Sequence, residues 1–113
     1  MAAALEVIGN LGVGEVCVGY VEAIPPGEGR TYRVGHDTVA VFRGRDGSLY
    51  AVQNECPHQR GPLSEGVAGG CTVICPMHGW KFNLETGACL NDPAHRLHTY
   101  PVREENGQLI VTF

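Results

Sequence analysis

Two short segments of this chain each place a cysteine and a histidine close together, and no other feature of the sequence constrains its fold as strongly. The segments are NECPHQRGPL, residues 54–63, and ICPMHGWKF, residues 74–82, and in both a proline directly follows the cysteine. A lone cysteine is usually a small hydrophobic core residue. Two such pairs on turn-rich loops instead predict the ligands of one shared metal centre. The four residues are Cys56, His58, Cys75 and His78.

The spacing of these ligands distinguishes between two kinds of metal centre. Two thiolates and two imidazoles suit either tetrahedral zinc or an iron–sulfur cluster. Zinc hairpins typically separate paired ligands by about two to four residues, and the pair Cys56 and His58 is spaced more tightly than that. In a two-iron cluster the cysteine and the histidine of one loop can bind different irons. The sequence therefore favours an iron–sulfur cluster, and a zinc-stapled interaction module without a redox role is the alternative.

Length and charge narrow the class of protein. A chain of 113 residues fits one domain with a modest core. A net charge of −4 with eight scattered Lys and Arg residues argues against a nucleic-acid partner, which needs a basic face. No stretch approaches the roughly 18 apolar residues of a membrane helix, and MAAALEVIGN lacks the basic start of a signal peptide. We therefore expect a cytoplasmic protein with no membrane partner, whose five cysteines are ligands or thiols and not disulfides.

Short runs of β-branched and aromatic residues, separated by glycine and asparagine turns, predict an all-β fold. Sixteen glycines and seven prolines favour many short strands, and a helical turn is expected only near Glu22–Ile24 because no window has a 3.6-residue apolar period. The segments GNLGVG (9–14) and GVAGG (66–70) lack the Gly-Lys-Ser/Thr of a phosphate loop and are interpreted as turns. Strands are expected at 15–21, 30–34, 38–42, 48–53, 71–75, 80–84, 98–102 and 108–113.

These elements predict a small antiparallel β sandwich or barrel into which the two cysteine loops are inserted as a cluster-binding subdomain. No internal repeat or linker divides the chain. We expect residues 1–12 to be a loose N-terminal lead-in and residues 13–113 to be a single domain.

The stretches CPHQRGPLSEG and CPMHGWKFNLETG closely resemble the signature of the Rieske [2Fe–2S] family, and the resemblance covers about residues 15–113. It implies one [2Fe–2S] cluster in a small antiparallel β sandwich. By this resemblance Cys56 and Cys75 would bind one iron, and His58 and His78 the other through Nδ1. In the cytochrome bc-type members each ligand loop carries a further cysteine, and the two form a disulfide. The matching positions here are Gly61 and Met77, so that bridge is impossible.

The resemblance also implies a low reduction potential. High-potential members place serine and tyrosine hydroxyls two and four residues after the second histidine, where this chain has Trp80 and Phe82. Hydrogen bonds to the sulfurs are among the factors that set the potential of such clusters. Without the two hydroxyl donors the reduced form is less favoured. The remaining cysteines, Cys17, Cys71 and Cys89, are interpreted as small core or strand residues.

As a member of such a family the chain is expected to carry single electrons and not to be an enzyme by itself. The donor would be an NAD(P)H-dependent flavoprotein reductase. The acceptor would be a terminal oxygenase, with the chain as the ferredoxin of an aromatic-ring dioxygenase, or the large subunit of an assimilatory nitrite reductase, with the chain as its small subunit. An apolar collar that includes Pro57, Met77 and Pro93 around the two histidines would form the docking tip.

Overall fold

The computed structural model describes residues 9–12, 14–57, 61–77 and 79–113, and in these residues the predicted all-β fold is confirmed. Within this part of the chain the only helical elements are two short 3-10 turns, and no helix has the length and apolar character needed to cross a membrane. The elements are β1 (Gly9–Gly12), β2 (Glu15–Tyr20), η1 (Val21–Ala23), β3 (Glu28–Val34), β4 (Asp37–Arg43), β5 (Leu49–Gln53), η2 (Leu63–Glu65), β6 (Val67–Gly69), β7 (Thr72–Ile74), β8 (Lys81–Asn83), β9 (Thr99–Tyr100), β10 (Val102–Glu105) and β11 (Gln108–Thr112).

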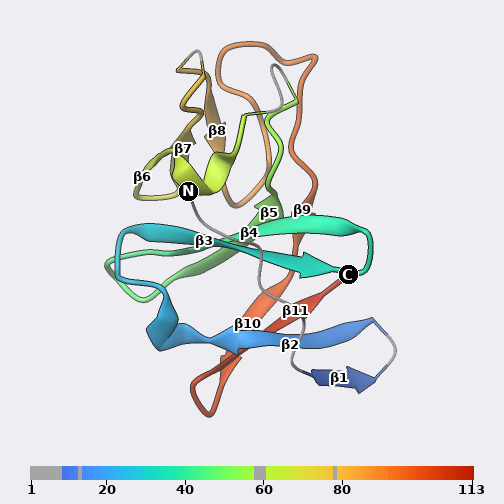
Figure 1. The fold of residues 1–113 in the computed structure, drawn as a ribbon. Helices are drawn as coiled ribbons and strands as arrows, with labels where there is room; N and C mark the ends of the chain where they lie inside the picture. Colours follow the sequence, from blue (N-terminus) through green and yellow to red (C-terminus); the bar gives the residue numbers. More distant parts are fainter. Residues whose placement is uncertain (1–8, 13, 58–60, 78) are drawn as a thin grey trace.

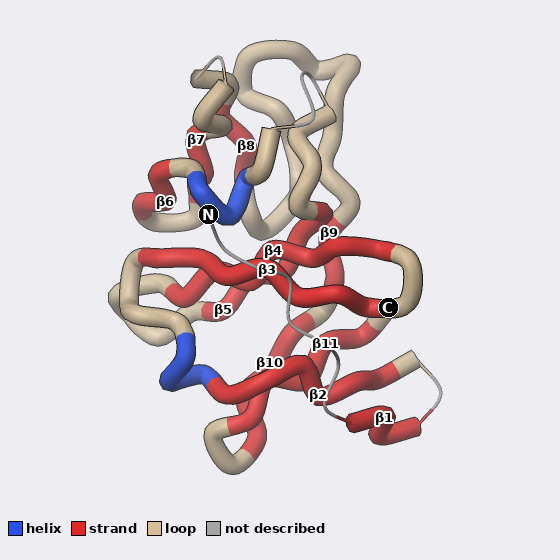
Figure 2. Tube along the Cα trace, viewed as in Figure 1, coloured by secondary structure: helices blue, strands red, loops and turns tan. Residues whose placement is uncertain are grey.

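The strands form three antiparallel sheets arranged in layers (Figure 1). One four-stranded sheet has the order β1-β2-β11-β10, and a second has the order β3-β4-β5-β9. The third, smaller sheet has the order β6-β7-β8 and lies beyond the second sheet, as Figure 2 shows with its strands above β3 and β4. The sheet β3-β4-β5-β9 is therefore the middle layer, between the rest of the sandwich and the subdomain that carries the cysteine loops.

Strand β4 shows why the middle sheet holds the molecule together. Val39 and Val41 belong to the hydrophobic core inside the sandwich, whereas Ala40 and Phe42 belong to the core beneath the small sheet. Successive side chains of a strand point to opposite faces, so a strand covered on both faces is apolar at every position. All four residues are fully buried. The middle sheet thus contributes one face to each of two cores. Cys56 and Cys75 belong to the core beneath the small sheet.

Four details differ from the sequence-based expectation. Residues 9–12, expected within a loose lead-in, form β1 and pair with β2, and residues 67–69 of the glycine-rich GVAGG form β6. The expected strand at 98–102 is divided by Pro101 into β9, which pairs with β5, and β10, which pairs with β11. Proline has no N–H for a strand ladder, and here it marks the point where the chain passes from one sheet to another. The expected helical turn near Glu22–Ile24 is present as η1, whereas η2 was not expected.

Candidate metal centre

The first cysteine loop runs from the end of β5 to η2, and Asn54 closes its base. The Asn54 backbone N–H donates to the Thr38 carbonyl on β4 (3.0 Å), and its carbonyl accepts from the Leu63 N–H (2.8 Å). Its side-chain Oδ1 accepts from the Ser64 N–H at 3.0 Å. Further along the loop, the Cys56 N–H donates to the Gly61 carbonyl at 2.9 Å. One asparagine thus joins both limbs of the loop to the middle sheet, and Cys56 stands just above this closure.

The second cysteine loop is the connection between β7 and β8, and it is closed by its own backbone. The Cys75 N–H donates to the Trp80 carbonyl (2.7 Å), and the Gly79 N–H donates to the Cys75 carbonyl (3.0 Å). Gly79 has φ 74°, a left-handed conformation that residues with a Cβ adopt at a cost. Cys75 therefore lies at the start of a tight turn, and both its N–H and its carbonyl are fixed by backbone hydrogen bonds to the other end of that turn.

The two loops meet at Gly61. Its carbonyl accepts the hydrogen bond from Cys56, and a Cβ added to it would collide with Cγ of Met77 and lie 3.3 Å from Sγ of Cys75. Cys56 and Cys75 are fully buried, belong to the same apolar cluster beneath the small sheet, and form no disulfide. Gly61 and Met77 approach each other closely, as expected of the two positions that match the disulfide cysteines of the cytochrome bc-type members. Two cysteines on separate loops thus lie beside the same glycine.

The chemistry of these two residues fits a soft metal or an iron–sulfur cluster. Thiolate is the ligand form of cysteine and the form that such metals prefer. A buried thiol that is neither bonded in a disulfide nor exposed to solvent suits a ligand enclosed by its loop. His58 and His78, the other two predicted ligands, lie outside the described residues, so the complete ligand set stays a prediction.

A third segment, residues 90–97, lies against the second loop, and sequence reasoning identified little of it beyond Pro93. The Leu90 N–H donates to the Lys81 carbonyl (2.8 Å), and Asn91 Oδ1 accepts from the Lys81 N–H (2.8 Å). The imidazole of His95 meets the Trp80 indole edge to face, with ring centroids 5.1 Å apart. The third segment therefore supports the residues that follow the second ligand loop.

A short polar cluster shapes this third segment. Asp92 accepts a hydrogen bond from the Ala94 N–H (2.9 Å), and its other carboxylate oxygen lies 3.2 Å from Nδ1 of His95. The hydrogen bond from Ala94, followed by the contact with His95, lowers the pKa of the Asp92 carboxyl below its usual value. The Asn91-Asp92-Pro93 sequence is typical of a turn of this kind, and this is the signal from which the segment could have been found.

Trp80 and Phe82, the two positions from which the resemblance predicts a low reduction potential, carry aromatic rings without a hydroxyl. Trp80 is half-buried and packs against the core beneath the small sheet, whereas Phe82 is fully buried within it. Cys17 and Cys89 are buried, and Cys71 is half-buried, where its Sγ accepts a hydrogen bond from Asn83 Nδ2 at 3.7 Å. These three cysteines lie in β2, in the segment after β8 and in the turn before β7, outside both ligand loops.

Comparisons with known proteins agree with this arrangement. A biphenyl dioxygenase ferredoxin subunit from Pseudomonas sp. (strain KKS102) is 38% identical over 97 residues, which cover 82% of this chain and 86% of that relative. A solved structure described as an NADH-dependent nitrite reductase small subunit from Mycobacterium tuberculosis has a TM-score of 0.82 at 29% identity, covering 88% of this chain and 94% of that chain. A chain in the complex of reduced oxygenase and oxidised ferredoxin in carbazole 1,9a-dioxygenase has a TM-score of 0.78 at 30% identity, covering 89% of this chain and 94% of that chain.

Larger relatives match over only part of their length. The chain spans 26% of the length of the 4beta-methylsterol monooxygenase of Methylococcus capsulatus, to which it is 34% identical over 95 residues. The Rieske [2Fe–2S] domain matches residues 14–101, which include both cysteine loops and the third segment. The buried cysteines on two touching loops, the three-layered antiparallel fold and this match lead to one conclusion: the chain belongs to the Rieske [2Fe–2S] domain family.

Proposed function

We propose that this chain is a Rieske-type ferredoxin that carries single electrons through one [2Fe–2S] cluster and is not a catalyst by itself. In this proposal Cys56 and Cys75 bind one iron, and His58 and His78 bind the other. The observation that carries it is that both buried cysteines lie beside Gly61: the Cys56 N–H donates to its carbonyl, and Sγ of Cys75 lies 3.3 Å from a Cβ added to it. A cluster supplies a centre that gains and loses one electron. The residues of this chain hold it, bury its cysteine side and leave a surface for a partner.

The surface beside the loops suits brief contact with another protein. Met77, at the tip of the second loop, is 51% exposed, and Leu90, bonded through its N–H to β8, is 60% exposed. Pro76 and Pro93 are exposed as well. Exposed apolar side chains near a redox centre favour a small interface that forms and separates quickly, as electron-transfer encounters require. Pro76 and Leu90 thus extend the predicted docking tip of Met77 and Pro93, whereas Pro57 is half-buried.

For the partners, we propose an NAD(P)H-dependent flavoprotein reductase as donor and a terminal oxygenase as acceptor, in the cytoplasm. The sequence likeness to a dioxygenase ferredoxin along most of both chains supports this choice. The small subunit of an assimilatory nitrite reductase is the second candidate, because a structure described as such a subunit has a TM-score of 0.82 to this chain. Reconstitution distinguishes the two: the purified chain should pass electrons from a flavoprotein reductase to a biphenyl-type dioxygenase faster than to a nitrite reductase large subunit.

Metal and sulfide analysis tests the cluster itself. Protein purified without oxygen should contain two irons and two acid-labile sulfides, and its reduced form should give a rhombic electron-spin signal with a low average g. Cys56→Ser and Cys75→Ser should abolish the cluster, and Cys17→Ser, a buried cysteine on β2, is the matched control that should retain it. Stoichiometric zinc without labile sulfide, in protein from iron-replete cells, would instead support the zinc-stapled module.

A further inference from the structure

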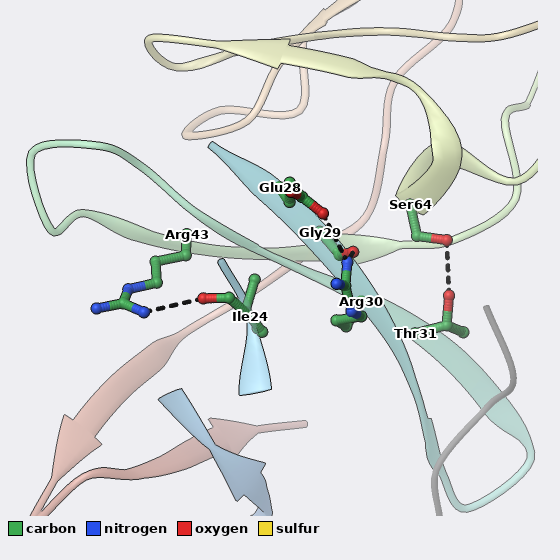
Figure 3. Close-up of polar contacts among 7 residues, drawn as sticks. All are labelled: Ile24, Glu28, Gly29, Arg30, Thr31, Arg43 and Ser64. Carbon is green, nitrogen blue, oxygen red and sulfur yellow. Dashed lines mark hydrogen bonds and ion pairs between the residues drawn. The ribbon is translucent and has the colours of Figure 1, made fainter. Parts of the chain in front are cut away.

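A buried pair of hydroxyl groups connects the sandwich to the first cysteine loop. The Thr31 hydroxyl on β3 donates to the Ser64 hydroxyl in η2 at 2.7 Å, across 33 positions of sequence. Figure 3 shows the two side chains pointing toward one another from the strand and the 3-10 turn. Both Thr31 and Ser64 are buried. A hydrogen bond inside a protein is stronger, and its loss more costly, than one at the surface.

Ser64 is also bonded to the base of the first cysteine loop. Its backbone N–H donates to Oδ1 of Asn54, and Asn54 is in turn bonded through its own N–H to Thr38 on β4. The loop is thus attached to two neighbouring strands of the middle sheet, to β3 through Thr31 and to β4 through Asn54. Cys56 follows Asn54 by two residues, so the attachment decides where the Cys56 loop stands above the sheet.

We propose that Thr31, Ser64 and Asn54 are positioning residues for the metal centre, which fix the Cys56 loop relative to β3 and β4 and thereby set the reduction potential. The inference rests on the proposed function, since it assumes a cluster bound by Cys56. The potential of such a cluster depends on hydrogen bonds to its sulfurs and on solvent exposure. Both depend on the position of the loop backbone. In this proposal backbone N–H groups of the loop would donate to the cluster sulfurs, and a loop released from β3 would align them less well, which would lower the potential.

Four variants separate positioning from stability. Thr31→Val is nearly isosteric and leaves the buried Ser64 hydroxyl without its partner, so it lowers the melting temperature. In Thr31→Val/Ser64→Ala both polar groups are gone, and the loss of stability is largely recovered because no buried group is left unsatisfied. Thr31→Ser keeps a hydroxyl at the same place. Thr112→Val, on β11 of the other sheet, is the matched control for a threonine-to-valine change away from the loops.

The decisive measurements are the potential, the electron-spin g values and amide hydrogen exchange, made on protein with full iron and sulfide content. The double variant should show a lower potential, altered g values and roughly fivefold to tenfold faster exchange of the Cys56 N–H, as expected for one lost hydrogen bond, while its melting temperature is close to the wild-type value. Thr31→Ser and Thr112→Val should match the wild type in all three measurements.

Other results would overturn the inference. An unchanged potential and unchanged g values in the fully loaded double variant would show that the pair only contributes to stability. If the double variant does not load the cluster, full loading of Thr31→Ser supports the proposal, and loss in both contradicts it. A wild-type chain without iron and sulfide would refute the proposed function instead, so the two failures are distinguishable.

Discussion

The two cysteine loops are held in different ways, although they carry the same kind of ligand. Beyond its backbone hydrogen bonds, the first depends on two side chains: Asn54 at its base accepts from the Ser64 N–H, and Thr31, 33 positions away on β3, holds Ser64. The second depends on backbone pairing within one hairpin, in which the Cys75 N–H donates to the Trp80 carbonyl. A hairpin tolerates changes of side chain as long as its turn is retained, whereas a loop held by particular side chains does not. Substitutions should therefore act more strongly on the first loop.

The point where the loops touch should be the most sensitive of all. Gly61→Val places a side chain against Met77 and Sγ of Cys75, and we expect a loss of stability at the upper end of about 1–3 kcal/mol together with loss of most of the bound iron. Gly69→Val in β6 is the matched control, because nothing lies within 4 Å of an added Cβ there. Chemical denaturation and iron analysis measure both effects.

A compensating change sharpens this prediction. Met77 is half-exposed and its side chain fills the space beside Gly61, so Gly61→Ala/Met77→Ala should retain more iron than Gly61→Ala alone. Equal iron loss in the two variants would show that the contact with Met77 does not limit the approach of the loops.

The difference between side-chain and backbone support can be tested with two asparagines. Asn54→Ala removes the acceptor of the Ser64 N–H, and we expect a cost of about 2 kcal/mol because the Ser64 amide belongs to a buried residue. Asn91→Ala removes a similar acceptor from the exposed Lys81 N–H, which water can then satisfy, and it should cost less than about 1 kcal/mol. Denaturant titration of the two variants gives the comparison, and a larger cost for Asn91→Ala would contradict it.

The second loop should affect the potential more than the stability. We expect a wild-type potential in the lowest third of the roughly −150 to +300 mV range of Rieske centres. Trp80→Ser with Phe82→Tyr would introduce two hydroxyls, and each new hydrogen bond of about 1 kcal/mol should raise the potential by on the order of 40 mV. Tyr50→Phe, which removes a hydroxyl from a residue packed on the same core, should leave it unchanged. Voltammetry decides the matter, and a wild-type value near the top of the range would contradict the assignment to the low-potential branch.

Local patterns in the sequence were sufficient for much of the fold. Asp46-Gly47 and Asn106-Gly107 are typical of turns between paired strands. The structure has β4 paired to β5 and β10 paired to β11 on either side of them. The cysteine pattern likewise predicted two converging loops, and the structure brings these loops together at Gly61, whereas the ligand set itself stays a prediction. The pairing of β6 and the change of sheet at Pro101 depend on which strands become neighbours in the fold. A local stretch of three or four residues does not contain that information.

The support of the first loop was beyond sequence reasoning for the same reason. Thr31 stands in an ordinary strand pattern and Ser64 in a short turn, and only the packing of η2 on the middle sheet brings their hydroxyls together. The two remaining predicted ligands, His58 and His78, rest on the sequence pattern and the family. Ligand residues can be predicted from a short local motif, whereas the residues that position a ligand are far apart in the sequence and are recognised only in the folded structure.

The smallest expected effect is the loss of stability at low pH, when Asp92 and Asp46 become protonated. The hydrogen bond from Ala94 and the contact with His95 lower the pKa of Asp92, and the hydrogen bonds from Ser48 lower that of Asp46 in the β4–β5 turn. Because the pKa of each carboxyl is lower in the folded state, each stabilises the fold above its unfolded pKa of about 3.9, and that contribution is lost as pH falls through the folded pKa.

Of these two aspartates only Asp92 belongs to the third segment, which contacts Trp80 through His95. Carbon-13 titration from pH 6 downward should show both carboxyls protonating below about pH 3.9, while the Trp80 indole signal follows Asp92 and is insensitive to Asp46. Asp92→Asn should remove the response of Trp80, since the amide oxygen still accepts from Ala94 but no longer titrates. A Trp80 signal that instead follows Asp46, or an Asp92 carboxyl that titrates above its usual value, would show that acid does not reach the second loop through the third segment.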